Sequence, residues 1–113
     1  MKVTSDDLRR FSKQIILKNI GAAGQKKIFS AKVLVVGIGG LGCPLILYLA
    51  NSGVGNIGIV DHDRVDITNL NRQILFNSKD VGKLKVDKAK KVIRNINKKI
   101  KIFSYKKKVN KEN

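Results

Sequence analysis

The chain has 113 residues, enough for one small domain, and 42% of them are hydrophobic, as is ordinary for a globular fold. Its 24 lysines and arginines outnumber 8 acidic residues, and the resulting net charge of +16 attracts polyanions without specificity. A single cysteine excludes an internal disulfide and a zinc cluster made by this chain alone, and no apolar run reaches the roughly 18 residues of a membrane span.

The N-terminal segment predicts two leading helices. It has no apolar core of a secretory signal, so we expect a cytoplasmic protein. Ser5 resembles a helix N-cap followed by acidic residues in the first turn. Helical spacing then predicts a helix from Asp7 to Lys18, which Gly21 ends, and a second short helix over residues 22–29. The apolar residues with this spacing are Leu8, Phe11, Ile15 and Ile16.

Residues 32–36 are apolar in their centre, which predicts a strand covered on both faces. They lead directly into a Gly-x-Gly-x-x-Gly loop over residues 37–42, and an apolar helix is predicted over residues 40–51. Such a loop gathers backbone N–H groups, and the helix directs the positive end of its dipole at an anion bound there. The sequence therefore predicts a nucleotide phosphate site at three glycines: Gly37, Gly39 and Gly42.

An acidic residue follows the next predicted strand. Residues 56–60 form this strand, and Asp61 comes directly after it, about 20 residues beyond the loop. A carboxylate at this position can accept hydrogen bonds from ribose hydroxyls. The combination favours a nucleotide site over a glycine turn that merely connects a strand to a helix.

Residues 61–82 are polar and irregular. A stretch of that length inside a compact domain is usually functional, and it lies beyond the carboxyl end of a strand, where open α/β sheets bind ligands. Beyond it, the hydrophobic pattern predicts a helix over residues 83–97 and a strand over residues 100–105.

The order of these elements predicts the fold class. Two helices followed by β-α-β-α-β predict a parallel sheet and one half of a Rossmann-like three-layer α/β fold. We expect a single nucleotide-binding domain with three parts: leading helices in residues 1–31, the Rossmann-like half in residues 32–105, and a basic tail in residues 106–113.

The positive charge is concentrated near the C-terminus. Residues 83–113 contain 13 lysines and arginines against Asp87 and Glu112. Aromatic residues are few and do not alternate with the lysines, so no stacking platform for single strands is predicted. We expect a solvated helix face and a loose tail, with no specific nucleic-acid partner and no membrane.

Four polar residues accompany the predicted phosphate site. Arg72 and Lys85 can neutralise charge at a triphosphate, and the Asn69 amide can bond ribose or phosphate oxygens. Asp63, with Asp66, could offer oxygen ligands to Mg²⁺, although no residue is assigned as a metal ligand. Cys43 at the start of the helix is predicted to be a small buried residue rather than a nucleophile.

Six blocks of this sequence, in this order, resemble the N-terminal part of the ThiF/MoeB/HesA adenylyltransferases, relatives of the ubiquitin-activating enzymes. The resemblance runs from Arg10 to about Lys101. The blocks are residues 10–17 (Arg-Phe-Ser-Lys-Gln-Ile-Ile-Leu), 37–43 (Gly-Ile-Gly-Gly-Leu-Gly-Cys), 50–57 (Ala-Asn-Ser-Gly-Val-Gly-Asn-Ile), 61–66 (Asp-His-Asp-Arg-Val-Asp), 69–73 (Asn-Leu-Asn-Arg-Gln) and 81–85 (Val-Gly-Lys-Leu-Lys).

The resemblance implies adenylation, with ATP and Mg²⁺, of the C-terminal carboxylate of a ubiquitin-like sulfur-carrier protein, in a thiamine or a molybdenum-cofactor pathway. Gly40 would approach the phosphates and Asp61 the ribose, while the remaining residues would contact the phosphates or the attacking carboxylate: Asn69, Arg72 and Lys85. The family places an arginine from a neighbouring subunit in the site, which implies a homodimer. Lys13 stands at that position and keeps the charge without the planar fork.

Family members continue beyond the length of this sequence, with a further aspartate that resembles a magnesium ligand and often a Cys-x-x-Cys zinc site. Whether this chain is itself an active enzyme therefore stays open. One alternative is a catalytically incomplete fragment that serves as a nucleotide-binding or dimerisation module and pairs with itself or with a missing C-terminal half. Another is an NAD-binding Rossmann domain, although residues 69–73 are foreign to such domains.

Overall fold

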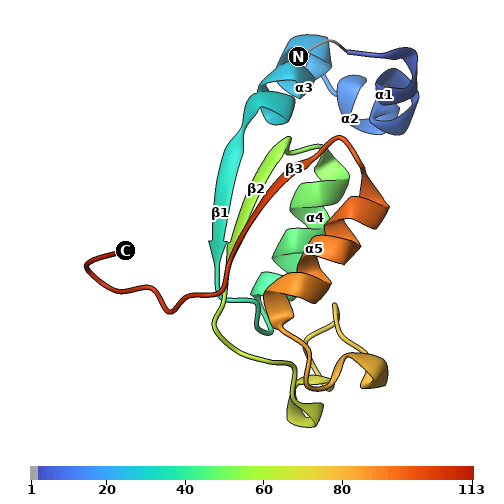
Figure 1. The fold of residues 1–113 in the computed structure, drawn as a ribbon. Helices are drawn as coiled ribbons and strands as arrows, with labels where there is room; N and C mark the ends of the chain where they lie inside the picture. Colours follow the sequence, from blue (N-terminus) through green and yellow to red (C-terminus); the bar gives the residue numbers. More distant parts are fainter. Residues whose placement is uncertain (1–2) are drawn as a thin grey trace.

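The computed structural model describes residues 3–113 as one α/β layer structure (Figure 1). Three strands lie side by side, α4 and α5 pack against each other along one face, and α1, α2 and α3 gather where the strands begin. The elements are α1 (Ser5–Arg10), α2 (Ser12–Ile15), α3 (Gly21–Ser30), β1 (Lys32–Val36), α4 (Gly42–Ser52), β2 (Asn56–Val60), the 3₁₀ turns η1 (Ile67–Asn69) and η2 (Ser78–Asp80), α5 (Lys85–Ile96) and β3 (Lys101–Tyr105).

The sheet is parallel throughout, in the order β1-β2-β3, which confirms the predicted Rossmann-like α/β class. β2 is the central strand, and its Ile57 and Ile59 are fully buried. They pack into one hydrophobic cluster with the inward residues of the two covering helices. Those residues are Ile46 and Ala50 on α4, and Ala89 and Ile93 on α5.

The opposite face of the sheet is open to solvent within residues 3–113. Leu34, Val36, Phe103 and Tyr105 are between 43% and 58% exposed, although all four are large and apolar. The prediction that the first strand is covered on both faces is therefore wrong for the described chain, because alternate residues of a strand point to opposite faces and only one face carries helices. The Leu34 side chain lies over Gly58 of β2. A Cβ added to Gly58 would lie 2.8 Å from Leu34 Cδ1.

The first predicted helix is broken into two. α1 ends at Arg10 and α2 begins at Ser12, because Phe11 leaves the helical conformation and is only 2% exposed. Its ring meets the Phe29 ring edge-on, with centroids 5.2 Å apart. The later elements lie within about two residues of their predicted bounds, since their hydrophobic spacing is longer and more regular.

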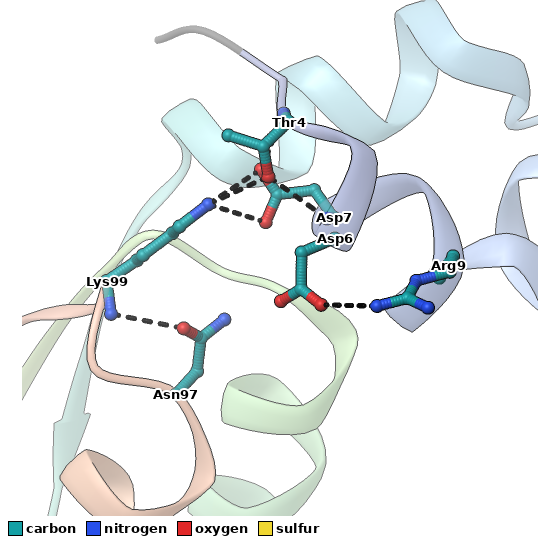
Figure 2. Close-up of polar contacts among 6 residues, drawn as sticks. All are labelled: Thr4, Asp6, Asp7, Arg9, Asn97 and Lys99. Atoms are coloured by element: carbon teal, nitrogen blue, oxygen red, sulfur yellow. Dashed lines mark hydrogen bonds and ion pairs between the residues drawn. The ribbon is translucent and has the colours of Figure 1, made fainter.

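Thr4, rather than Ser5, caps α1, and the cap is tied to the far end of the chain (Figure 2). The Asp7 backbone N–H donates to Thr4 Oγ1 at 3.2 Å, and the Thr4 N–H donates to the Asp7 carboxylate at 3.0 Å. Lys99, between α5 and β3, donates from Nζ to both Asp7 carboxylate oxygens at 3.0 Å. Asp7 is 2% exposed, so this ion pair holds the leading helices against the core.

Three further hydrogen bonds anchor the leading helices to the C-terminal ends of the covering helices. Arg10 Nη1 donates to the Ile96 carbonyl at the end of α5. The Gln14 and Gln25 side-chain amides both donate to the Ser52 carbonyl at the end of α4. These bonds satisfy carbonyls that a helix C-terminus leaves without partners. Across residues 3–113, no helix combines the length and hydrophobicity needed to cross a bilayer.

The Asp7 ion pair predicts a specific acid sensitivity. Burial raises the pKa of Asp7, but the Thr4 N–H and the Lys99 ammonium outweigh this effect and lower the pKa below its ordinary value. The ionised carboxylate therefore stabilises the fold above its unfolded-state pKa, about 3.9, and this stability is lost as the pH falls through the lower folded-state pKa. Asp7→Asn should reduce the free energy of unfolding at neutral pH by about 2 kcal/mol and weaken its decline in acid.

Urea unfolding across a pH series measures this effect. Asp6→Asn is the matched control, because Asp6 makes only an exposed pair with Arg9 at 3.4 Å and should change stability by less than about 0.5 kcal/mol. Equal losses in the two variants would show that the buried pair is not what anchors α1.

Candidate functional site

Apart from Lys13, the predicted site residues belong to segments at the carboxyl ends of the strands, at the end of the sheet away from the leading helices (Figure 1). Gly37 follows β1, and Asp61 follows β2. The long loop over residues 61–84 leads from Asp61 to Lys85, the first residue of α5. The Arg64–Leu84 bridge draws the two ends of that loop together.

Backbone geometry explains why two positions of the glycine loop require glycine. Gly37 has a φ of +90° and donates its N–H to the Val60 carbonyl at 2.8 Å, so the loop starts in a left-handed turn bonded to the end of β2. A Cβ on Gly42 would lie 2.1 Å from the Gly37 carbonyl oxygen, so only glycine lets α4 begin this close to the strand. Gly39, in contrast, has nothing within 4 Å of an added Cβ, so the space beside it is open.

Asp61 joins the glycine loop to the loop after β2. It is 8% exposed, its Oδ2 accepts the Ile38 N–H at 2.7 Å, and its Oδ1 accepts the Asp63 N–H at 2.7 Å. The sequence predicts a ribose contact for this carboxylate but does not reveal that it also joins two loops. Each carboxylate oxygen keeps a further lone pair for a hydroxyl donor.

Arg72 lies over the glycine loop. The Cγ and Cδ atoms of Arg72 are 3.6 Å from the Cβ position of Gly40. Its Nη1 donates to the Thr68 carbonyl at 3.1 Å and to Asn71 Oδ1 at 2.9 Å, which hold the guanidinium beside the loop. The cation is therefore positioned at the place where the sequence predicts a phosphate.

Asn69 and Asp66 form the η1 turn rather than a metal site. Asn69 Oδ1 accepts the Asp66 N–H at 2.9 Å, while the Asp66 carboxylate accepts both the N–H and the hydroxyl of Thr68. These Thr68 bonds lower the pKa of Asp66. Since the Asn69 oxygen is engaged in the turn, its amide nitrogen is the group it can offer to a ligand.

Lys85 is the first residue of α5 and is 5% exposed. Its backbone N–H donates to the Asp63 carbonyl at 3.1 Å, which fixes the start of α5 against the loop after β2. Cys43 is fully buried nearby, and burial raises the pKa of its thiol, opposed in part by the Lys85 charge. Cys43 is thus the packed small residue that the sequence predicted.

Oxygen ligands for Mg²⁺ are present beside the loop. Asp61, His62 and Asp63 each offer one atom within 4.8 Å of the others, and His62 Nε2 lies 3.2 Å from Asp63 Oδ1. Mg²⁺ prefers oxygen ligands, so Asp61 and Asp63 fit it and the imidazole does not. Asp66 is not a member of this group.

Lys13 is not brought to this cluster within one chain. It lies on α2, whose neighbouring residue Gln14 is bonded to the C-terminal end of α4, whereas the glycine loop precedes the other end of α4 (Figure 1). Only a second copy of the chain could present Lys13 to the loop.

Two buried polar side chains in residues 61–82, Asp80 and Gln73, are not predicted from the sequence. Asp80 accepts the Asn77 N–H and pairs with Lys88 Nζ at 3.3 Å, and these contacts outweigh burial and lower its pKa. Gln73 is 4% exposed, and its Oε1 has no partner within residues 3–113. The i,i+3 pairing of polar residues in η1 and η2 is a capping-box signal that could have revealed both turns.

A parallel sheet whose glycine loop is bonded to a carboxylate at the next strand end defines the class of Rossmann-like nucleotide-binding domains. The profile of the ThiF family matches residues 11–113. The chain belongs to the ThiF family.

Curated relatives are considerably longer than this chain. "Adenylyltransferase and sulfurtransferase MOCS3" of Culex quinquefasciatus is 49% identical over 104 residues, which are 92% of this chain and 24% of the relative. "Adenylyltransferase and sulfurtransferase uba4" of Aspergillus terreus is 52% identical over 92 residues, which are 81% of this chain and 19% of the relative. The chain thus spans about a fifth to a quarter of the length of these relatives.

Two solved structures show the same fold with ATP bound. The tRNA N6-threonylcarbamoyladenosine dehydratase TcdA of E. coli, in complex with ATP, is 30% identical with a TM-score of 0.89 over 96% of this chain and 44% of its own. E. coli MccB with ATP is 35% identical with a TM-score of 0.82 over 89% of this chain and 32% of its own.

The glycine loop predicts a contrast between two substitutions. Gly42→Ala should lower the free energy of unfolding by about 2–4 kcal/mol, because its Cβ would overlap the Gly37 carbonyl and force strand and helix apart. Gly39→Ala adds the same methyl group into open space and should change stability by less than about 1 kcal/mol. Thermal unfolding of both variants checks the contrast, and equal stabilities would refute the close approach at Gly42.

Proposed function

We propose that this chain is the ATP-binding part of an adenylyltransferase that activates the C-terminal carboxylate of a ubiquitin-like sulfur-carrier protein. The observation that carries the proposal is a glycine loop bonded to Asp61, with Arg72 over Gly40 and a buried Lys85 at the start of α5. The ATP complexes of TcdA and MccB and the names of the curated relatives support it.

The reaction needs little covalent chemistry from the protein. A carrier carboxylate oxygen attacks the α-phosphorus of ATP, the bond to the bridging oxygen of pyrophosphate breaks, and an acyl-adenylate forms. Negative charge develops on the phosphate oxygens, so cations fixed in advance lower the barrier most. Arg72 and Lys85 supply such charges, and the loop N–H groups bind the phosphates. Bound Mg²⁺ would neutralise triphosphate charge, with Asp63 as the carboxylate that could hold it while Asp61 serves the ribose.

Asn69 and Asp61 orient the nucleotide in this proposal. Asp61 has lone pairs left for the ribose hydroxyls, and the Asn69 amide nitrogen can donate to a ribose or phosphate oxygen. Because Asp61 also holds the Ile38 N–H, ribose and phosphates would be aligned by one rigid unit. Such alignment before the reaction is a large part of the rate advantage in nucleotidyl transfer.

Nucleotide titration tests the proposal. Arg72→Ala and Lys85→Met should each weaken ATP–Mg²⁺ binding at least tenfold by isothermal titration, about 1.4 kcal/mol or more, because each removes a cation from the phosphates. Lys91→Ala, an exposed lysine further along α5, should leave binding unchanged. An absence of heat with the folded protein would overturn the proposal, and tighter binding of NAD than of ATP would favour a dinucleotide-binding domain instead.

We also infer that the chain forms a homodimer through α4. In such a dimer, Lys13 of the partner subunit could reach the glycine loop. Leu41, Leu45 and Tyr48 are 88%, 46% and 76% exposed and lie on one face of α4 at helical spacing. α4 carries no charged residue, so two copies of a chain with charge +16 can meet there with the least repulsion. Dimerisation would persist as a function of this chain even if catalysis requires further polypeptide.

Sedimentation velocity over a concentration series tests the dimer. The native chain should associate, and Tyr48→Glu should weaken association at least tenfold because it buries a charge in an apolar contact. Tyr105→Glu is the matched control, since it places the same charge on the exposed face of the sheet. A monomeric native chain, or loss of association with Tyr105→Glu alone, would contradict the assignment to α4.

A further inference from the structure

A basic groove runs along the outer side of α5. Its first part, with a volume of about 610 Å³, lies between α5 and the Arg64–Leu84 bridge, and its second part, about 350 Å³, continues from Arg94 toward the start of β3. Gly82, Leu84 and Asp87 complete the first part. The cations that line the groove are Arg64, Lys83, Lys90, Lys91, Arg94 and Lys98.

These cations have little internal compensation. Asp87 is the single acid in the lining. Lys83 lies 3.9 Å from Asp80, but within residues 3–113 no ion pair joins Lys90, Lys91, Arg94 or Lys98 to a carboxylate. Arg64 is held in place, because its Nη1 donates to the Gly82 carbonyl at 2.9 Å. The groove therefore gathers like charges whose mutual repulsion a bound polyanion would relieve.

The chemistry of the lining distinguishes between polyanions. Protein interfaces are enriched in aromatic residues and depleted in lysine, whereas this groove has four lysines and no aromatic residue. The lack of aromatic residues equally removes the stacking surface that single-stranded bases need. What remains is recognition of a regular row of phosphates, the part of a nucleic acid that is bound without reading its sequence.

The dimensions agree with a duplex. α5 has 12 residues and is therefore about 18 Å long, a length that faces about five phosphates along one strand of a duplex. We propose that the groove binds the phosphodiester backbone of a double-stranded nucleic acid. This binding is independent of the ATP site, and it departs from the expectation that α5 presents only a solvated basic face.

Fluorescence anisotropy with a labelled RNA duplex tests the proposal across a salt series. The variant Lys91→Glu/Arg94→Glu reverses two exposed charges in the groove, and Lys106→Glu/Lys107→Glu reverses two in the tail, so both variants have the same net charge. The groove variant should bind at least tenfold more weakly, and its slope of log K against log salt should fall by about 2. The tail variant should lose less than about threefold, because its charges lie outside the groove.

Other outcomes would overturn the proposal. Equal losses in the two variants would show that net charge alone binds the duplex. Stronger binding of a single strand, or competition by polyglutamate at an equal charge concentration, would indicate a different ligand. A DNA duplex should bind within a few-fold of the RNA duplex, and a marked preference for one base sequence would contradict a phosphate-only contact. Circular dichroism of both variants verifies that they remain folded.

Discussion

The candidate site depends on one carboxylate. Asp61 accepts two short hydrogen bonds from backbone N–H groups, one in the glycine loop and one in the loop after β2. Besides Asp61, the bond from the Gly37 N–H to the Val60 carbonyl and the approach of the Arg72 side chain to Gly40 hold the glycine loop in place. Because a buried carboxylate is costly unless it is hydrogen-bonded, the two N–H groups also make the burial of Asp61 tolerable. The Asp61 carboxylate thus positions the glycine loop and keeps lone pairs that could accept hydrogen bonds from a ribose.

Different interactions hold the structure together at the two ends of the sheet. At the starting end of the strands, apolar packing of Phe11 and the buried Asp7–Lys99 pair hold the leading helices. At the carboxyl end, hydrogen bonds to loops do most of the positioning, and few side chains fill the space beside Gly39. Rigidity at one end and open space at the other is the arrangement that a ligand site at strand ends requires. The exposed apolar face between the ends shows that residues 3–113 do not by themselves complete the layers of a doubly wound sheet.

Helices and strands with a sustained hydrophobic period could be predicted from the sequence. The prediction was wrong where a single buried side chain interrupts a helix. The strands and α3, α4 and α5 follow from apolar spacing and glycine positions alone. The break at Phe11 does not, because it depends on the Phe29 ring, 18 residues further along the chain. The covering of a strand is likewise a tertiary property: an apolar run such as residues 32–36 is compatible with one covered face or two. For the site, residue types and order indicated a phosphate and ribose site, but the two loop bonds of Asp61 could not be read from spacing.

The distribution of acidic residues links the candidate ATP site to the basic groove. Of the 8 acids in the chain, four accept backbone N–H groups: Asp7, Asp61, Asp66 and Asp80. Carboxylates used in this way stabilise caps and loops, and within residues 3–113 Asp80 alone among them pairs with a lysine of α5, Lys88, at 3.3 Å. The surface of α5 therefore keeps most of its positive charge. At physiological ionic strength the field of these lysines extends only about 8 Å, so it does not replace the cations at the loop. In the proposed functions, a triphosphate would use Arg72, Lys85 and the N–H groups of the glycine loop, whereas a long polyanion would use the groove, so the two ligands would not compete for the same charges.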